Sequence, residues 1–146
     1  VDRSTKQTYL RFDLSTIPSG AIIDEATLTM TAHTGFAYGG NGNVHTYFVG
    51  DDSWLENSIN YNNAPAHGSS TSLGSWFLWY DYNDYAVRIG TYTSEALRDR
   101  VAIESAGDRV LSLRVSCSGY RTNYRSREYA DASARPQLSI TYTATP

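Results

Sequence analysis

A two-residue alternation of apolar and polar side chains recurs along this chain and restricts its fold more than any other feature. In residues 8–14 (TYLRFDL), every second position from Leu10 to Leu14 is apolar. Successive side chains of a β-strand point to opposite faces, so this pattern predicts a half-buried strand. The same period predicts further strands in four segments: residues 25–33, 44–50, 109–117 and 136–143. A bulge in residues 44–50 is expected to blur the two faces of that strand.

Turn signals separate the predicted strands. Pro18 and Gly20 predict a turn within residues 15–23, because proline and glycine interrupt regular structure. Residues 39–43 (GGNGN) predict a second break of the hairpin type.

The middle of the chain contains the predicted helix. Residues 75–92 are aromatic and are expected to hold one or two strands. A short helix is then predicted near residues 95–104, with an N-cap at Thr93 or Ser94 and an end at Gly107.

These elements describe an all-β chain. Its 146 residues are enough for one domain with a real core. Aromatic residues make up 13% and charged residues 18%, which excludes a disordered chain and a coiled coil. Many short strands with one short helix predict an antiparallel two-sheet β-sandwich, formed by residues 1–146 as a single domain.

Composition also limits the cellular location and the classes of binding partner that we expect. Cys117 is the sole cysteine, so it forms no internal disulfide, and few oxidisable residues favour an extracellular protein. No apolar run approaches the ~20 residues that span a bilayer, so we expect no membrane partner. The net charge is −3 and no nucleic-acid-binding motif is present, so we expect no nucleic-acid partner.

Charge is distributed unevenly along the chain. Residues 1–109 contain seven basic and thirteen acidic side chains, whereas residues 110–146 contain five arginines and two acidic residues. Arginines outnumber lysines eleven to one, and the planar guanidinium group suits carboxylate, sulfate or phosphate. The C-terminal quarter therefore predicts an anion site, with internal ion pairs as the alternative.

Three segments, taken in order, resemble one known family. Residues 8–30 (TYLRFDLSTIPSGAIIDEATLTM) resemble its entry pattern, and residues 54–65 (WLENSINYNNAP) resemble its Trp-x-Glu…Asn-x-Pro segment. Residues 126–142 (SREYADASARPQLSITY) resemble its closing Ser-Arg-Glu…Pro-x-Leu signature. The chain is therefore similar to the DNRLRE-type jelly-roll family, which includes carbohydrate-binding modules of alginate lyases and related secreted polysaccharide-degrading enzymes.

The resemblance implies a jelly roll and assigns structural roles at its end. Family members begin with a further strand or two, and we expect no counterpart of these before the first predicted strand of residues 1–146. Arg127 and Glu128 match the closing signature and are expected to be structural, and a buried Glu128 would need a partner such as Arg11. Three residues outside the signature are freer to face a ligand: Arg121, Tyr124 and Arg125.

Candidate ligand-binding residues follow from alternation. Sugar rings bind flat aromatic faces, and acidic sugars also bind Arg or His. Four such residues fall on strand faces opposite the apolar ones: Arg11, His45, Tyr47 and Arg114. We expect them to line a groove whose rim is the loop 118–125, with Arg121 and Tyr124. The aromatic residues of 76–85 (WFLWYDYNDY) are expected to be divided between core and surface.

The sequence evidence for catalysis and for metal binding is weaker than the evidence for ligand binding. Jelly-roll lyases use Tyr, His and Arg, but none of their local signatures is present, and no facing carboxylates or zinc-ligand spacing are found. We therefore expect no enzymatic activity and no cofactor, with a structural calcium ion as the alternative left open. The acidic groups available for calcium do not form a 12-residue calcium loop: Asp51-Asp52, Asp81-x-Asn83-Asp84 and Glu128.

The sequence thus predicts a non-catalytic carbohydrate-binding module. It would attach an extracellular enzyme or surface protein, through covalently adjacent domains, to a polysaccharide, an acidic one in our hypothesis. The alternative is a structural β-sandwich building block of a cell-surface or filament assembly, with neighbouring subunits as partners and the lacking first strand supplied by another chain.

Alternation also predicts a core, in which Phe12→Ala would cost about 3–5 kcal/mol. Nine residues are expected to be buried: Leu10, Phe12, Leu28, Met30, Trp54, Leu111, Leu113, Leu138 and Ile140.

Overall fold

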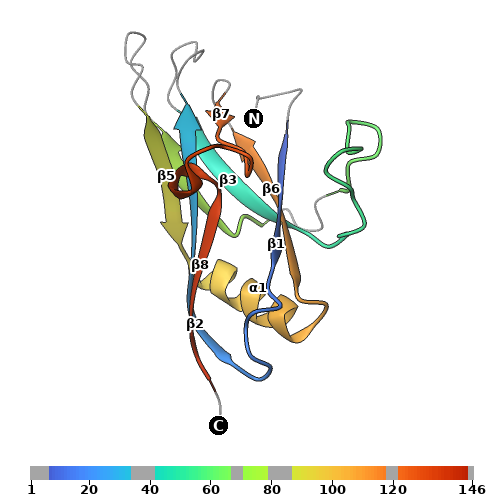
Figure 1. Cartoon of the computed structure of the whole chain (residues 1–146), viewed down its shortest axis with the longest axis vertical. Coiled ribbons are helices and arrows are strands. Elements are labelled where there is room, and N and C mark those ends of the chain that lie inside the picture. The colour runs from blue at the N-terminus through green and yellow to red at the C-terminus, as the bar shows by residue number, and fades with distance from the viewer. Residues whose placement is uncertain (1–6, 34–41, 67–70, 79–86, 118–121, 145–146) are drawn as a thin grey trace.

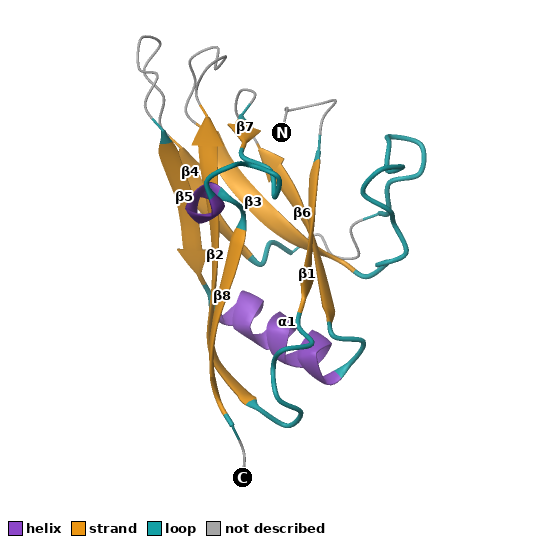
Figure 2. Cartoon of the chain, viewed as in Figure 1, coloured by secondary structure: helices purple, strands orange, loops and turns teal. Residues whose placement is uncertain are grey.

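Two antiparallel sheets form the protein in its computed structural model, which describes residues 7–33, 42–66, 71–78, 87–117 and 122–144 (Figures 1 and 2). The first sheet has the order β1 (Thr8–Asp13), β6 (Val110–Cys117), β3 (Gly42–Val49) and β4 (Gly74–Leu78). In the second, β2 (Ile22–His33) pairs with β5 (Arg88–Thr93) on one edge and with β7 (Asn123–Tyr124) and β8 (Gln137–Thr143) on the other. The predicted two-sheet antiparallel β-sandwich is confirmed.

Alternation identified the strand faces correctly in the centre of each sheet. In β6, Leu111, Leu113 and Val115 are fully buried, as the period of two requires. The position of the bulge was wrong, however: β3 pairs regularly with both of its neighbours. The register shift lies in β2, between Ile23 and Glu25.

Helix α1 (Glu95–Ala106) confirms the predicted helix and extends it by two residues. Ser94 is the N-cap, and its Oγ accepts a hydrogen bond from the backbone N–H of Leu97 at 3.1 Å. Leu97 and Val101 are fully buried, and α1 contacts β2 and β6, so it packs across one end of the sandwich (Figure 1). Neither α1 nor the short helix η1 (Ala132–Ala134) is long and apolar enough to cross a membrane.

One side of the sandwich, here named the closed side, is formed by β4 and β5, which contact each other across the two sheets. The indole of Trp76 in β4 stacks on the ring of Tyr92 in β5, with centroids 6.0 Å apart. A Cβ atom at Gly90 would lie 2.1 Å from Nε1 of Trp76, so the indole needs a glycine there. The hydroxyls of Tyr92 and Thr46 bond to each other inside this packing.

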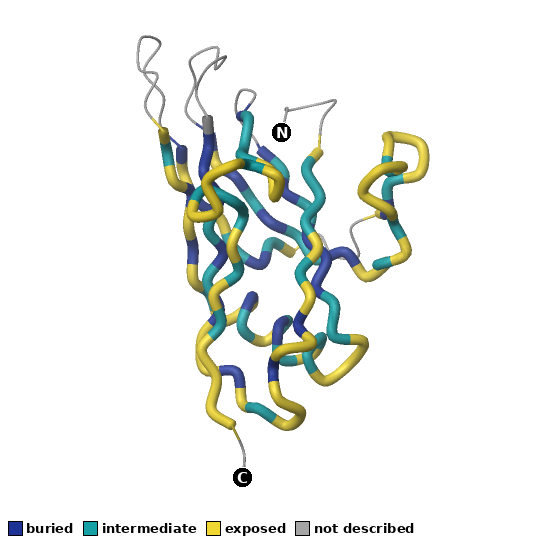
Figure 3. The backbone as a smooth tube through the Cα atoms, in the orientation of Figure 1, coloured by how far each residue is buried: buried dark blue, intermediate teal, exposed yellow. Residues whose placement is uncertain are grey.

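The opposite side, here named the open side, is formed by β1 and β8, which scarcely approach each other. Leu10 and Phe12 of β1 and Leu138 and Ile140 of β8 pack against the core but are only half-buried, and both strands are mostly teal or yellow in Figure 3. The prediction of full burial is wrong for these four, because β1 and β8 do not pack closely against each other and cavities remain beside these side chains. Burial is confirmed for four other residues: Leu28, Met30, Leu111 and Leu113.

Candidate functional site

The face of the β1-β6-β3-β4 sheet that points away from the core collects the polar and aromatic strand residues. This outer face is defined by residues that alternate with the buried ones: Tyr9, Arg11, His45, Tyr47, Ser112, Arg114 and Ser116. The strand register places Arg114 directly between Tyr9 of β1 and Tyr47 of β3. The four strand residues predicted for a ligand site therefore share one face.

Arg114 is the centre of this face. Its guanidinium lies 5.0 Å from the ring centroid of Tyr47, and the ring of His45 lies 6.4 Å from that of Tyr47. Nε of Arg114 is buried and has no hydrogen-bond partner among the described residues, and none of their carboxylates forms an ion pair with this guanidinium. Burial raises the pKa of Tyr9, and the positive charge of Arg114 acts in the opposite direction.

The segment 51–66 folds back over part of the outer face. Nε1 of Trp54 donates a hydrogen bond to Oγ of Ser112 at 3.2 Å, and the indole lies 5.9 Å from the ring of Tyr9. Ser112 and Val49 are fully buried even though both point away from the core, as expected under such a cover. Trp54 was predicted to be in the core; it is instead half-buried on the outer face, because the chain returns over the sheet here.

Arg11 holds this segment in place. Its Nη1 donates to the carbonyl oxygens of Asp52 at 3.1 Å and Trp54 at 2.8 Å. Its guanidinium also lies 4.9 Å from the centroid of the Trp54 indole. Arg11 is exposed, and both hydrogen bonds of its Nη1 go to this segment.

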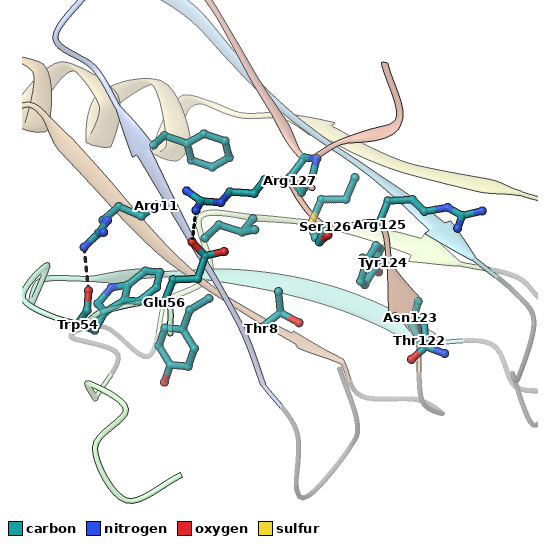
Figure 4. A pocket seen from close by; sticks show the side chains of 15 residues that line it. Thr8, Arg11, Trp54, Glu56, Thr122, Asn123, Tyr124, Arg125, Ser126 and Arg127 are labelled. Atoms are coloured by element: carbon teal, nitrogen blue, oxygen red, sulfur yellow. Dashed lines mark hydrogen bonds and ion pairs between the residues drawn. The ribbon is translucent and has the colours of Figure 1, made fainter. Parts of the chain in front are cut away.

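A cleft of about 500 Å³ lies on the open side, between β1 and the segment 122–127 (Figure 4). Leu10, Phe12 and Met30 supply apolar lining. The charged side chains of the lining are Arg11, Glu56, Arg125 and Arg127. Tyr9 and Trp54 belong to both the outer face and the cleft, so the two surfaces are contiguous at β1.

Arg127 forms an ion pair from one wall of the cleft to the other. Its Nη2 lies 2.8 Å from Oε2 of Glu56, and its Nε donates to Oε1 of Glu128 at 2.6 Å (Figure 4 shows the pair with Glu56). This hydrogen bond lowers the pKa of Glu128. A partner such as Arg11 was expected for Glu128 if it were buried; the Glu128 side chain is instead 62% exposed, and its carboxylate pairs with Arg127.

The remaining predicted site residues have other positions. Tyr124 lines the cleft, but its hydroxyl accepts a hydrogen bond from Nε1 of Trp76 at 3.3 Å, which ties it to the core. Arg125 places its guanidinium 4.0 Å from the ring centroid of Tyr129. Arg121 and most of the aromatic stretch lie outside the described residues: Trp79, Tyr80, Tyr82 and Tyr85.

In the described parts of the chain, no three His, Cys, Asp or Glu side chains lie close enough to hold a metal ion. The carboxylate of Asp51 accepts hydrogen bonds from the side chain and backbone of Ser53, and these lower its pKa. Burial raises the pKa of Asp52. Asp81, Asn83 and Asp84 fall outside the described residues. A structural calcium ion stays a prediction.

Sequence reasoning missed two features of these surfaces. Tyr9 belongs to the outer face, and the alternation that selected Arg11 was enough to find it. The pair of Glu56 with Arg127 joins segments that are remote in the sequence, so no local pattern contains it.

Comparison with known proteins gives one match. The sequence model of carbohydrate-binding module family 96 matches residues 1–142, which include β1 through most of β8. No curated protein matches the chain significantly. The finer resemblance to DNRLRE-type modules and alginate lyases stays a prediction. A family match over nearly the whole sequence, on a β-sandwich with an arginine and aromatic face, leads to one conclusion: this chain belongs to carbohydrate-binding module family 96.

Proposed function

We propose that this module is non-catalytic and attaches an extracellular enzyme or surface protein to an acidic polysaccharide such as alginate. The polysaccharide lies on the outer face. Arg114 pairs with a carboxylate or sulfate group, and Tyr9 and Tyr47 contact the sugar rings on either side of it.

The observation that supports this most is the surroundings of Arg114. Its guanidinium lies between two tyrosines and forms no ion pair with a carboxylate of the described residues. Arginine binds a carboxylate through two parallel hydrogen bonds, and such charge-assisted bonds are about twice as strong as neutral ones. An acidic sugar supplies the carboxylate partner that the described residues do not offer to Arg114.

The row of Tyr9, Arg114 and Tyr47 also matches the chemistry of a charged sugar. Adjacent strands lie about 4.8 Å apart, so three strands present an aromatic ring, a cation and a second ring over about 10 Å. Pyranose rings offer apolar faces to the tyrosines, while their carboxylates are directed to the guanidinium. The match to a carbohydrate-binding module family supports the sugar as ligand.

The test is affinity electrophoresis in gels that contain alginate, polygalacturonate or a neutral glucan. We expect Arg114→Gln to weaken binding to the acidic polymers about tenfold or more, the contribution of a hydrogen bond to a charged group. Binding should also weaken with added salt, since exposed charges are screened beyond about 8–10 Å.

The matched control is Arg98→Gln, which removes an arginine from α1 that pairs with Asp99 at 2.7 Å, away from the outer face. Arg98→Gln should bind as the wild type does. If Arg114→Gln also binds like the wild type, the outer face is not the site. If Arg114→Gln instead lowers the melting temperature and no variant binds a glycan, Arg114 is structural.

One observation favours the alternative function, a building block of an assembly. A cavity of about 220 Å³ lies on the open side between β1 and β8, lined by Phe12, Leu138 and Ile140. A strand from a neighbouring subunit placed there would cover these half-buried side chains. Sedimentation velocity over a range of concentrations separates the two functions: a monomer throughout argues against an assembly, and a reversible polymer supports it.

A further inference from the structure

The cleft on the open side contains a carboxylate that belongs to the protein. Glu56 reaches into it from the segment 51–66 and pairs with Arg127 on the opposite wall, with 2.8 Å between Oε2 and Nη2. Figure 4 shows the two side chains pointing toward each other across the space that the cleft lining encloses. An acidic ligand that entered the cleft would meet Arg127 at the place where Glu56 now sits.

The other two arginines of the cleft have different surroundings. Arg11 donates to the carbonyl oxygens of Asp52 and Trp54, and Arg125 lies over the ring of Tyr129 and points away from the pair in Figure 4. Neither pairs with a carboxylate among the described residues. Both add positive charge to the lining. The positive charges of its three arginines therefore outnumber the single negative charge of Glu56.

The contact between Glu56 and Arg127 is easy to exchange. The side chain of Arg127 is 74% exposed and that of Glu56 is 45% exposed. Exposed ion pairs contribute little to stability, because water and dissolved ions compete for both partners. Glu56 can therefore leave Arg127 at small cost when another carboxylate takes its place.

We propose that the cleft is a second subsite for the acidic polysaccharide and takes a uronate residue whose carboxylate displaces Glu56 from Arg127. This inference rests on the proposed function, because Tyr9 and Trp54 join the outer face to the cleft and so give one polysaccharide chain a path into both. In the free protein Glu56 then occupies the position of the ligand's carboxylate, and it competes with that carboxylate for Arg127.

The lining suits such a residue in other respects. Leu10, Phe12 and Met30 offer apolar surface to one face of a pyranose ring. Thr8, Asn123 and Ser126 also line the cleft and supply polar groups for sugar hydroxyls. A volume of about 500 Å³ lies within the range of small-molecule sites.

Isothermal titration calorimetry with a short uronate oligosaccharide, and with its carboxyl-reduced neutral counterpart, tests the proposal. Glu56→Gln keeps the shape and removes the competing charge. We expect it to strengthen binding of the uronate oligosaccharide up to about fivefold, the contribution of an exposed ion pair. Arg127→Gln should weaken binding of the same oligosaccharide about tenfold, and neither change should affect the neutral sugar.

Asp99→Asn is the matched control, since it keeps the side-chain shape and breaks the exposed ion pair of Arg98 on α1. It should leave both affinities unchanged. If Glu56→Gln binds the uronate oligosaccharide no better than the wild type, or gains equally for the neutral sugar, Glu56 is not a competitor and the proposal is wrong.

Failure of this subsite is distinct from failure of the outer face. A loss with Arg114→Gln and no gain with Glu56→Gln leaves the outer face as the site and overturns the subsite. A gain with Glu56→Gln and no loss with Arg114→Gln supports the subsite and overturns the outer face. If no variant, Glu56→Gln included, binds the uronate oligosaccharide, both proposals are overturned.

Discussion

The closed and open sides of the sandwich are each formed by one strand from each sheet, but their side chains differ in how deeply they are buried. On the closed side, Trp76 is 6% exposed and Tyr92 is 8% exposed, and Gly90 gives the indole its space. On the open side, Phe12 and Leu138 touch the core but keep part of their surface in water, and cavities lie beside them.

The difference indicates how stability and binding are divided in this protein. Burial of apolar surface is the main source of folding free energy and large rings bury the most surface per residue, so the closed side contributes more of it than the open side. A ligand needs surface that the fold leaves unfilled, and in our proposal the open side with the adjoining outer face supplies that surface. Substitutions should therefore affect stability on one side and binding on the other.

The largest effect is expected for Trp76→Ala on the closed side. Removing a buried indole loses its transfer free energy and leaves a cavity, at a cost of about 3–5 kcal/mol. Urea unfolding monitored by circular dichroism measures the change. Ile103→Ala, at a residue that is 57% exposed on α1, should change stability by less than about 0.5 kcal/mol. Equal losses for the two variants would remove the distinction on which the comparison depends.

Gly90→Ala should have the next largest effect, about 3 kcal/mol, at the upper end of what overpacking costs. The new methyl would lie 2.1 Å from Nε1 of Trp76, and that indole also packs against the rings of Tyr92 and Tyr124, with centroids 6.0 and 6.1 Å away. Gly50→Ala is the matched control, since its methyl would meet only the Phe48 ring at 3.4 Å. A thermal melt in which both variants match the wild type would mean that the closed side adapts freely.

Alkaline pH should weaken the closed side through Tyr92, because burial raises the pKa of its hydroxyl to about 12. Between pH 10 and 12 an unfolded tyrosine loses its proton while Tyr92 keeps it, so the folded state binds more protons and stability falls as pH rises. The contribution is complete below pH 10, and two pKa units correspond to a loss of about 2–3 kcal/mol by pH 12.

Tyr92→Phe provides the control for this pH dependence. It removes the hydrogen bond with Thr46, which should cost about 1 kcal/mol at neutral pH. Its unfolding free energy should then decline less between pH 10 and 12 than that of the wild type, with Tyr9 and other tyrosines supplying the remaining slope. The same decline in both proteins would contradict the assignment to Tyr92.

The sequence predicted what depends on neighbours along the chain. A period of two placed Leu111 and Leu113 inside and Arg114 outside, and a serine before a helical stretch marked the start of α1. These features are local, so a single sequence contains them.

What the sequence did not predict depends on contacts between distant segments. Trp54 is on the outer face because the segment 51–66 folds back over Ser112, and no periodicity indicates that return. The degree of burial of Leu138 depends on how closely β1 of the other sheet approaches β8, which the pattern within β8 does not record. The positions of Arg11 and Arg114 followed from alternation, whereas the Glu56–Arg127 pair required the folded chain.

The smallest effect is expected for Phe12→Ala on the open side. Full burial led to an expected cost of about 3–5 kcal/mol, but a ring that keeps part of its surface in water loses less transfer free energy and leaves an opening rather than a sealed cavity. We expect a loss of about 1–2 kcal/mol in urea unfolding, well below that of Trp76→Ala. A loss equal to that of Trp76→Ala would mean that something covers the open side in solution. Sedimentation velocity on the wild type would then decide whether a second copy of the protein provides that cover. A loss near zero would mean that Phe12 does not pack against the core at all, and that the cavity it lines is simply open to solvent.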